Sequence, residues 1–529
     1  MLQEDKYFSS LSEEEIWQRY CGFLDLSLDE YMCIQQHLLE EQIALVADSA
    51  LAKKIMGNEK PKSVEEFRRL VPLTKYDDYE PYLVERRDDV LAVEPLEWCH
   101  SSGRGGNFKW IPYTSSALEE SSRLFVSYMI LASANRKGEV KIKPGERVIM
   151  HIPPQGYSSY TFCYHASQAF TVRLIPTLEE AEGQDLRERI QKGFQMALRS
   201  GVDEIASISS VMVKVGERMA EEAQGLRLSP FMLHPRVLSR FMRGWLRSKL
   251  QKRSMFPKDL WSPKCIITGG TDTSIYKDSV AHYWGQIPFE MYGASEVPTI
   301  AVQNWTKKWL TFIPYFAFWE FIPEDESIKS REDSNYHPST LLYDELEAGK
   351  VYEVVLTHFH GMPFLRYRIG DTIKVVALSD DEAGVKLPQV VFHARVGETI
   401  DLASLARLTE RVIWQALANT GVRFEEWAAC KEYDRDRAYL RMYIELKEER
   451  DATEIERLLD EHLKVVDPDY RDIDSYLEFQ PIKVTVLSEG TFERFYQERV
   501  KEGADLAHLK PTHINADEAI LQELVKLSG

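Results

Sequence analysis

Short apolar runs that end in turns alternate with helical stretches through the middle of the chain. The runs at 147–152, 265–268 and 288–292 are each followed by proline or glycine. This alternation predicts an α/β fold with parallel strands, because consecutive parallel strands need a helical crossover between them. Ligands of such folds gather in the loops that follow the strand C-termini, so we expect functional residues in those loops.

The chain is too long for a single core, and its pattern changes after Asp371. Its 529 residues favour two or more packed units. Apolar runs at 351–356 and 372–376 predict strands of a small β element that completes the large domain. We therefore expect a large N-terminal domain at 1–394, built on parallel sheets, and a small C-terminal domain at 395–529.

The C-terminal part of the chain mixes strand and helix patterns. Apolar runs at 438–446 and 482–486 predict two strands. Asp451 and Glu454 have the spacing of a capping box, which predicts that a helix begins there. These patterns together favour a small α+β unit.

Composition argues against several classes of partner. The formal net charge of −19 disfavours a nucleic-acid surface, because phosphate contacts need clustered lysine and arginine. Six scattered cysteines without a C-x-x-C pair predict neither a zinc site nor a disulfide framework, and they favour a reducing compartment. No apolar run approaches the roughly 18 residues that span a bilayer, and the N-terminus lacks a signal-peptide pattern. We expect a cytoplasmic protein that binds small molecules and has neither nucleic-acid nor membrane partners.

One basic stretch stands out on this acidic chain. From Arg236 to Arg253 there are seven basic residues and no acid, while Phe241, Trp245 and Leu250 could form an apolar stripe. Such a helix could dock anionic lipid or the phosphate of a carrier. A solvated helix face is the interpretation that we favour from the sequence.

His358 and His360 form an H-x-H pair at the end of a predicted strand. A structural metal site needs more ligands than two, and no third candidate lies nearby in the sequence. We assign the pair a structural role and no metal.

The loop from Ser101 to Lys109 is the first candidate for nucleotide chemistry. Its sequence, SSGRGGNFK, combines two hydroxyls, three glycines and a trailing lysine. A flexible backbone and a cation suit the binding of phosphate oxygens. The loop lacks the Gly-Lys-Ser/Thr of a Walker loop, and an ordinary glycine-rich turn before the helix expected at 117–132 remains an alternative.

Two later segments carry acids at turns. In YGASE, which ends at Glu296, the acid follows a predicted strand and could hold Mg²⁺, although a solvated loop residue fits as well. In RYRIGD, which ends at Asp371, a turn presents an acid that could accept hydrogen bonds from two ribose hydroxyls. An aspartate that ends a hairpin is the alternative for this segment.

Taken in order, these segments resemble the acyl-activating adenylate-forming superfamily, which includes firefly luciferase and acyl-CoA ligases. The closer resemblance is to the plant auxin-conjugating acyl-acid amido synthetases and their bacterial relatives. It rests on VPLTKYDDYEP at 71–81, KWIPYT at 109–114, VYEVVLT at 351–357 and RYRIGD at 366–371. Further points are GTF at 490–492, GA at 503–504 and KP at 510–511. The likeness therefore runs from about residue 65 to residue 512.

The resemblance implies a site for ATP and Mg²⁺. Phosphates would lie along the loop that begins at Ser101, adenine beside Gly270 and Thr271, and ribose on Asp371. Tyr292 would stack on the adenine ring. The implied nucleotide-binding residues are Ser101, Ser102, Gly103, Arg104, Lys109, Gly270, Thr271, Tyr292, Ser295, Asp371 and Arg395.

Two residues are implied to be catalytic. Glu296 would hold Mg²⁺, and Lys510 would reach the reacting carboxylate and the α-phosphate when a mobile C-terminal domain closes. The loop departs from the family at Arg104, where relatives carry threonine or serine. Arg104 could neutralise phosphate charge, or it could mark a loop that binds ATP differently.

The implied reaction is adenylation of a small carboxylic acid, followed by acyl transfer to the amine of an amino acid with release of AMP and pyrophosphate. One alternative is a ligase that transfers the acyl group to a thiol, either coenzyme A or a carrier. The other is a non-catalytic protein that binds a nucleotide or an acyl acid through a degenerate phosphate loop.

Overall fold

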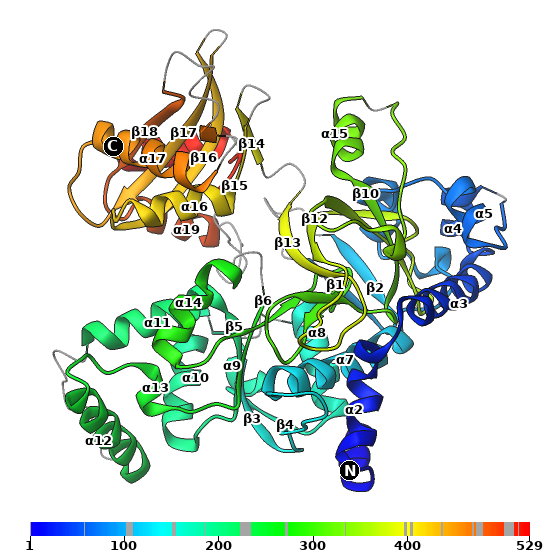
Figure 1. Cartoon of the computed structure of the whole chain (residues 1–529), viewed down its shortest axis with the longest axis horizontal. Coiled ribbons are helices and arrows are strands. Elements are labelled where there is room, and N and C mark those ends of the chain that lie inside the picture. Colours follow the sequence, from blue (N-terminus) through cyan, green and yellow to red (C-terminus); the bar gives the residue numbers. More distant parts are fainter. Residues whose placement is uncertain are drawn as a thin grey trace. The chain divides into compact units, whose positions relative to one another are not determined.

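The computed structural model divides the chain into two compact units, Met1–His393 and Ala394–Gly529. The first unit opens with helices, and helices and strands then alternate between residues 115 and 292 (Figure 1). The residues that the structure describes are 2–57, 59–101, 109–150, 155–184, 186–222, 234–269, 273–333, 335–395, 399–402, 406–434, 437–467, 470–471, 480–501, 513–516 and 518–529.

Five parallel strands form one half of the sheet in the first unit. In spatial order they are β4 (Val172–Ile175), β3 (Glu146–Met150), β5 (Glu204–Ile208), β6 (Cys265–Gly269) and β7 (Phe289–Tyr292). Each strand pairs in parallel with the next. β3, β6 and β7 are the strands expected from the three apolar runs, so the predicted α/β fold is confirmed.

Six further strands extend the same sheet beyond β7, so this sheet has eleven strands among the described residues. They are β8 (Ala301–Gln303), β9 (Leu310–Phe312), β13 (Gln389–Arg395), β12 (Tyr367–Ala377), β11 (Val351–His358) and β10 (Ala317–Pro323). The strands expected at 351–356 and 372–376 are β11 and part of β12, and they belong to this one sheet. β11 is buried from its second residue onward, which is the pattern of a strand covered on both faces.

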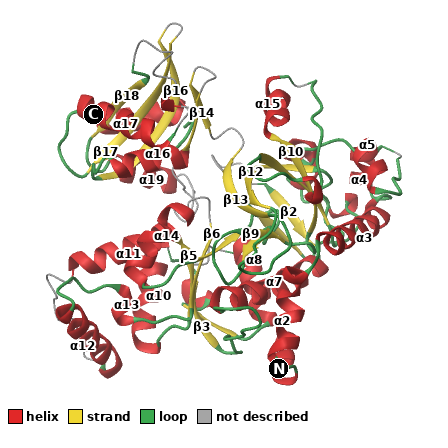
Figure 2. Ribbon diagram, in the orientation of Figure 1, coloured by secondary structure: helices red, strands yellow, loops and turns green. Residues whose placement is uncertain are grey.

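Helices cover the sheet of the first unit (Figure 2). The longer ones are α1 (Gln3–Ser10), α2 (Glu13–Cys21), α3 (Leu28–Val46), α4 (Ala50–Met56), α5 (Val64–Leu70), α7 (Ser115–Ser133), α8 (Ser158–Ala169), α10 (Leu186–Ser200), α11 (Ser209–Glu222), α12 (Pro235–Leu250), α14 (Thr273–Trp284) and α15 (Glu324–Glu332). The one-turn helices are α6 (Glu80–Leu83), α9 (Leu178–Ala181) and α13 (Pro257–Leu260). α7 contains the helix expected at 117–132.

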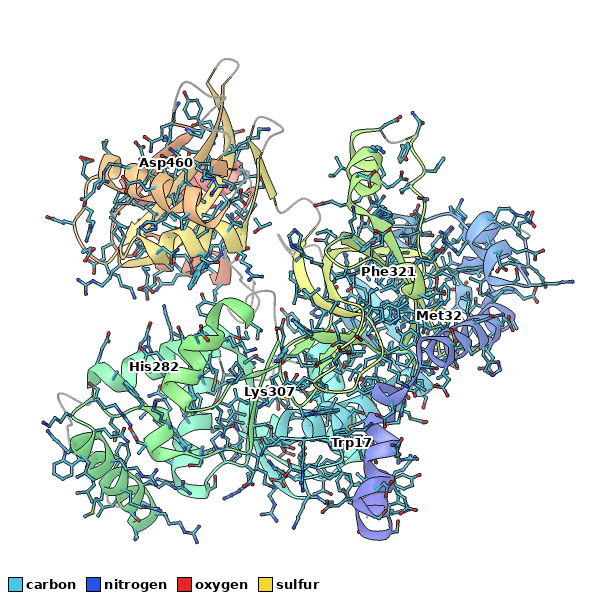
Figure 3. The ribbon with its side chains drawn as sticks, in the orientation of Figure 1. Trp17, Met32, His282, Lys307, Phe321 and Asp460 are labelled. Atoms are coloured by element: carbon cyan, nitrogen blue, oxygen red, sulfur yellow. The ribbon has the colours of Figure 1, made fainter. Side chains whose placement is uncertain are left out.

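Buried polar side chains fix the N-terminal helices to the antiparallel half of the sheet. Gln35 of α3 donates to the carbonyl oxygens of Pro314 at 2.7 Å and Ala317 at 2.9 Å. Trp17 lies on α2 (Figure 3). Its indole makes an aromatic contact with Trp305, with 5.4 Å between ring centroids. A buried amide that lost such partners would cost about 1–3 kcal/mol, so these contacts specify how the helices pack.

The second unit is a three-stranded sheet with helices. Its strands are β16 (Phe424–Asp434), β17 (Arg437–Leu446) and β18 (Ile482–Leu487), with a hairpin of β14 (Thr399–Leu402) and β15 (Ala406–Thr409). Its helices are α16 (Glu410–Asn419), α17 (Ala452–Val466), α19 (Thr491–Lys501) and α20 (Glu518–Ser528). The strands expected at 438–446 and 482–486 are confirmed by β17 and β18.

One detail of the expected helix start in this unit is wrong. Asp451 does cap α17, because its side chain accepts a hydrogen bond from the backbone N–H of Thr453 at 2.9 Å. Glu454 does not complete a capping box, since its carboxylate instead binds the guanidinium of Arg450 at 3.1 Å. Among the described helices of both units, none is long and apolar enough to cross a lipid bilayer.

Candidate active site

A tight loop after β7 presents two of the expected site residues. A Cβ atom at Gly293 would lie 2.1 Å from the carbonyl oxygen of Pro298, so only glycine fits there. The N–H of Ala294 donates to the carbonyl oxygen of Val297 at 2.8 Å, and the N–H of Ile300 donates to that of Tyr292 at the same distance. The backbone thus holds the loop that carries Ser295 and Glu296 at the C-terminal edge of the parallel strands.

Hydrogen bonds from two other segments fix the backbone of Glu296. Its carbonyl oxygen accepts from the hydroxyl of Tyr113 at 3.0 Å and from Nε2 of His358 at 2.9 Å. Burial lowers the pKa of His358 to about 3, so the ring is neutral at physiological pH. His358 therefore acts as a neutral hydrogen-bond donor that positions Glu296, which agrees with a structural role for this histidine.

The carboxylate of Glu296 has a cation and a hydroxyl beside it. Its Oε1 accepts from Nζ of Lys109 at 3.2 Å and from the hydroxyl of Tyr367 at 3.0 Å. The same Nζ lies 3.0 Å from the Tyr367 hydroxyl. Glu296 is 5% exposed, and a buried carboxylate of this kind needs a compensating charge. The expected metal-ligating acid and the expected phosphate-binding lysine thus lie in direct contact.

Asp371 lies within a strand, which corrects the expectation that a turn presents it. The register of β11 against β12 changes from Glu353 opposite Thr372 to Val355 opposite Arg368. This irregularity is a bulge, and Gly370 within it has a φ of 84°. In the sequence, the Gly-Asp pair resembles a turn, because glycine with a positive φ occurs both in turns and in β-bulges.

The bulge brings Asp371 to the aromatic residue at the end of β7. The hydroxyl of Tyr292 donates to Oδ2 of Asp371 at 2.8 Å. Both side chains are buried, and the Tyr292 ring meets the edge of Phe392 at 5.5 Å between centroids. Two residues expected at the adenine and ribose are therefore in contact, although 79 positions separate them in the chain.

The ends of the glycine-rich loop pair with each other. The loop connects β1 (Glu97–His100) to β2 (Trp110–Tyr113) in an antiparallel hairpin, so a strand separates it from α7. The N–H of Ser101 donates to the carbonyl oxygen of Lys109 at 2.9 Å, and the N–H of Lys109 donates to Oγ of Ser101 at 3.2 Å. Oγ of Ser295 accepts from Oγ of Ser158 at 3.0 Å. Ser101, Lys109 and Ser295 are thus all tied to neighbouring backbone or side chains.

Several expected site residues lie outside the described part of the chain. They are Ser102, Gly103, Arg104, Gly270, Thr271 and Lys510. Arg395 is the last residue of β13, and its side chain also falls outside the description. Gly270 and Thr271 directly follow β6, whose C-terminus is at the same edge of the sheet as that of β7.

Three residues that contact Glu296 were not expected in the site from the sequence: Tyr113, Tyr367 and His358. Tyr367 lies inside the RYRIGD segment, so its place in that motif was an available signal. Arg366 of the same segment has a structural role, because its guanidinium pairs with the buried carboxylate of Glu320 at 2.8 Å. Tyr113 lies in the KWIPYT segment and His358 in the H-x-H pair, but neither pattern predicts a contact with Glu296, because the three residues are distant in sequence.

In the second unit, His513, which is three positions beyond Lys510 in the sequence, contacts the sheet. Nδ1 of His513 lies 2.6 Å from Glu410 and Nε2 lies 2.7 Å from Glu426. Burial alone would lower the pKa of His513, but these two carboxylates raise it to about 10. The charged ring stacks on Trp427 at 4.5 Å, and its backbone oxygen accepts from the N–H of Ala429 at 2.6 Å.

Comparison with known proteins gives three matches to domains of one family. The GH3 family N-terminal domain matches residues 23–159, the central domain 310–395 and the C-terminal domain 408–519. Indole-3-acetic acid-amido synthetase GH3.17 of Arabidopsis thaliana is 21% identical over 90% of each chain. Jasmonoyl–L-amino acid synthetase GH3.5 of Oryza sativa subsp. japonica is 24% identical over 49% of this chain and 46% of its own.

Solved structures share the fold of the whole chain. The GH3.15 acyl acid amido synthetase in complex with 2,4-DB superposes with a TM-score of 0.67 at 18% identity and covers 97% of this chain and 96% of its own. A 2-hydroxyisobutyryl-CoA ligase in the postadenylation state has a TM-score of 0.59 at 12% identity, with coverage of 89% and 92%. At these identities the likeness establishes the fold.

Proposed function

Because this chain belongs to the GH3 family, we propose that it is a ligase that adenylates a small carboxylic acid with ATP and transfers the acyl group to the amine of an amino acid. AMP and pyrophosphate would be the other products. The relatives named as amido synthetases support this reaction. The observation that carries the proposal is the Tyr292–Asp371 hydrogen bond beside the loop that holds Glu296.

The nucleoside of ATP would bind at Tyr292 and Asp371. A carboxylate can accept about four hydrogen bonds, so the Tyr292 hydroxyl orients Asp371 and leaves it suited to accept from ribose hydroxyls as well. Gly270 and Thr271 would lie beside the adenine, as the resemblance implies. Ser295 and Arg395 complete the proposed nucleotide site.

Phosphates and Mg²⁺ would bind at Glu296 and along the loop from Ser101 to Lys109. Glu296 would supply a carboxylate oxygen, the type of ligand that Mg²⁺ prefers, from the loop after β7. Lys109, whose Nζ lies 3.2 Å from this carboxylate, would pair with the phosphates instead when the metal binds. Mg²⁺ would offset the charge of the phosphates. Ser102, Gly103 and Arg104 would contribute N–H groups, a hydroxyl and a guanidinium to the same anions.

The residues of this chain would act by positioning and by charge. Substrate carboxylate and ATP are both anions, so lysines that lower their repulsion favour attack of the carboxylate on the α-phosphorus. Lys510 would supply positive charge in this first step, and a moving C-terminal domain would withdraw it before the amine attacks. The contacts of His513 support this role, because they hold the chain three residues beyond Lys510 to a folded sheet.

The acceptor and the compartment are further parts of the proposal. An amino acid is the proposed acceptor, and a thiol is the alternative. The cytoplasm is the proposed compartment, which the six cysteines support because all are free thiols.

The test is ATP–pyrophosphate exchange with Mg²⁺ and a panel of carboxylic acids, followed by addition of amino acids or coenzyme A. We expect exchange that depends on the acid and an amide product that mass spectrometry identifies. A thioester formed in preference to an amide would favour the coenzyme A ligase. Absence of exchange across the whole panel, with nucleotide binding retained, would favour a non-catalytic binding protein.

A further inference from the structure

Helix α12 turns a row of large apolar side chains toward solvent. Five of them are at least 44% exposed. Because an α-helix turns by about 100° per residue, their spacing places them along one side of α12. They are Leu238 (44%), Met242 (56%), Trp245 (50%), Leu246 (51%) and Leu250 (83%). We call these five residues the apolar stripe. Single exposed apolar residues need no explanation, whereas a contiguous row of this size marks an interaction surface.

Arginines occupy the neighbouring side of the same helix. They are Arg236, Arg240, Arg243 and Arg247, and we call them the arginine row. Arg236, Arg243 and Arg247 are exposed and form no ion pair with any described residue. No aspartate or glutamate occurs from Ala223 to Lys258, although the chain as a whole carries a net charge of −19.

The arginine row is a concentration of like charge. The pKa of Arg240 is lowered, mainly by burial and also by the positive charges of Arg243, Arg147 and Arg236. The nearest acids already have partners, because Asp203 pairs with Arg147 and Asp259 pairs with Arg253. An external anion is therefore the counter-charge that would best relieve this repulsion. The row therefore favours an anionic partner.

Small residues attach α12 to the rest of its unit. Val237, Gly244 and Ser248 form the buried side of the helix. A Cβ at Gly244 would lie 3.0 Å from a methyl carbon of Leu260 in α13, so the helix packs closely on that side. Packing on this side leaves the apolar stripe and much of the arginine row facing outward, and Figures 1 and 2 show α12 at the periphery of the first unit.

A shallow apolar hollow lies beside the stripe. It has a volume of about 140 Å³ and is lined by Phe241, Met242, Trp245 and Met255. Hydrocarbon could fill this space without a polar partner. The hollow adds to the apolar area that the helix presents to solvent.

We propose that α12 docks the protein on the surface of an anionic lipid bilayer. The helix lies in the plane of the interface, the apolar stripe enters the boundary between headgroups and acyl chains, and the arginine row binds lipid phosphates. The sequence favoured a solvated face, but the structure shows that Val237 and Phe241 pack on the core while the five residues of the apolar stripe face solvent. This inference does not depend on the proposed function.

Charge and shape separate a bilayer from the other occupants of this surface. Nucleic acid would contact the arginines but would leave five large apolar side chains without cover. A second copy of the chain would cover the stripe, but it would bring two arginine rows together. An anionic bilayer satisfies both the apolar and the cationic side of α12.

The test is co-sedimentation of the full chain with vesicles of phosphatidylcholine, with and without phosphatidylglycerol. We expect binding to the anionic vesicles that falls as salt is raised. The double variant Arg243→Gln/Arg247→Gln should bind about 25-fold more weakly, because each basic residue near such a surface contributes roughly fivefold. The variant Trp245→Ser/Leu246→Ser should bind roughly tenfold more weakly or worse.

A matched control variant removes two positive charges, as Arg243→Gln/Arg247→Gln does, but from helices other than α12. Lys54 of α4 and Arg69 of α5 are exposed and lie far from α12 in the first unit (Figure 1). Lys54→Gln/Arg69→Gln should bind anionic vesicles as the native chain does. Equal loss in this control, equal binding to both kinds of vesicle, or no binding of the native chain would overturn the proposal. Dimerisation that the Trp245 and Leu246 substitutions abolish would assign the surface to a second copy instead.

Discussion

Replacing Asp371 with asparagine tests the ribose contact. In the native protein the Tyr292 hydroxyl lies 2.8 Å from the Asp371 carboxylate. The amide oxygen of asparagine can still accept this hydrogen bond, so the pair should keep its geometry. Hydrogen bonds to a charged group contribute about 1.5–3 kcal/mol, against about 0.5–1.5 kcal/mol for neutral ones. Loss of about 1 kcal/mol from each of two ribose hydroxyls gives about 2 kcal/mol, which corresponds to a roughly 30-fold higher KM for ATP.

The assay is pyrophosphate exchange with ATP and with 2′,3′-dideoxy-ATP. The native enzyme should discriminate strongly against the dideoxy nucleotide, and Asp371→Asn should discriminate much less. Asp380→Asn is the matched control, since Asp380 is equally buried and accepts from Asn304 at 3.0 Å outside the site. It should lower stability and leave the KM for ATP unchanged. If Asp371→Asn raised the KM for both nucleotides by the same factor, the ribose assignment would be refuted.

Glu296→Gln should slow pyrophosphate exchange at least tenfold at low Mg²⁺, and the rate should partly recover as the Mg²⁺ concentration is raised. If the exchange rate of neither the native protein nor the variant depended on Mg²⁺, the metal-binding role would be contradicted. Lys510→Ala should slow adenylation about 100-fold or more while leaving the KM for ATP nearly unchanged, and near-native exchange would contradict its role. Burial, with a contribution from Glu146, raises the pKa of Glu204 from 4.5 to about 8. The folded state therefore keeps a proton that the unfolded state loses between these values, so stability falls as pH rises through this range, by up to about 5 kcal/mol. Glu204→Gln should raise Tm at pH 9 more than at pH 5, and an equal shift at both would show that ionisation of Glu204 is not the cause.

The strands and the site segments could be predicted from sequence wherever the signal is local. β3, β6 and β7 are short apolar runs with a turn residue after each, and Glu296 follows β7 directly. Periodicity and turn chemistry act within a few residues, which is why they are visible in the chain. The loop after β7 was therefore correctly located.

Contacts between distant segments could not be predicted. Asp371 looked like a turn residue because the bulge at Gly370 depends on its pairing with β11. The donors to Glu296 come from Tyr113 and His358, which are 183 and 62 positions away. Neither contact leaves a local pattern.

The orientation of α12 was hidden for a similar reason. Its sequence shows an apolar stripe and a basic one, but the side that packs is chosen by Gly244 against Leu260 in α13. Trp245 then faces solvent, while Val237 is buried. Only tertiary packing decides which apolar residues serve the core.

The central claim is that the acid is activated as an acyl adenylate, and an isotope experiment tests it most directly. A substrate acid with ¹⁸O in its carboxylate attacks the α-phosphorus of ATP, and the later attack of the amine leaves one carboxylate oxygen on AMP. We therefore predict AMP that carries one ¹⁸O atom when the amide forms, as read by mass spectrometry. Amide formation with unlabelled AMP, or with ADP and labelled phosphate, would contradict the account.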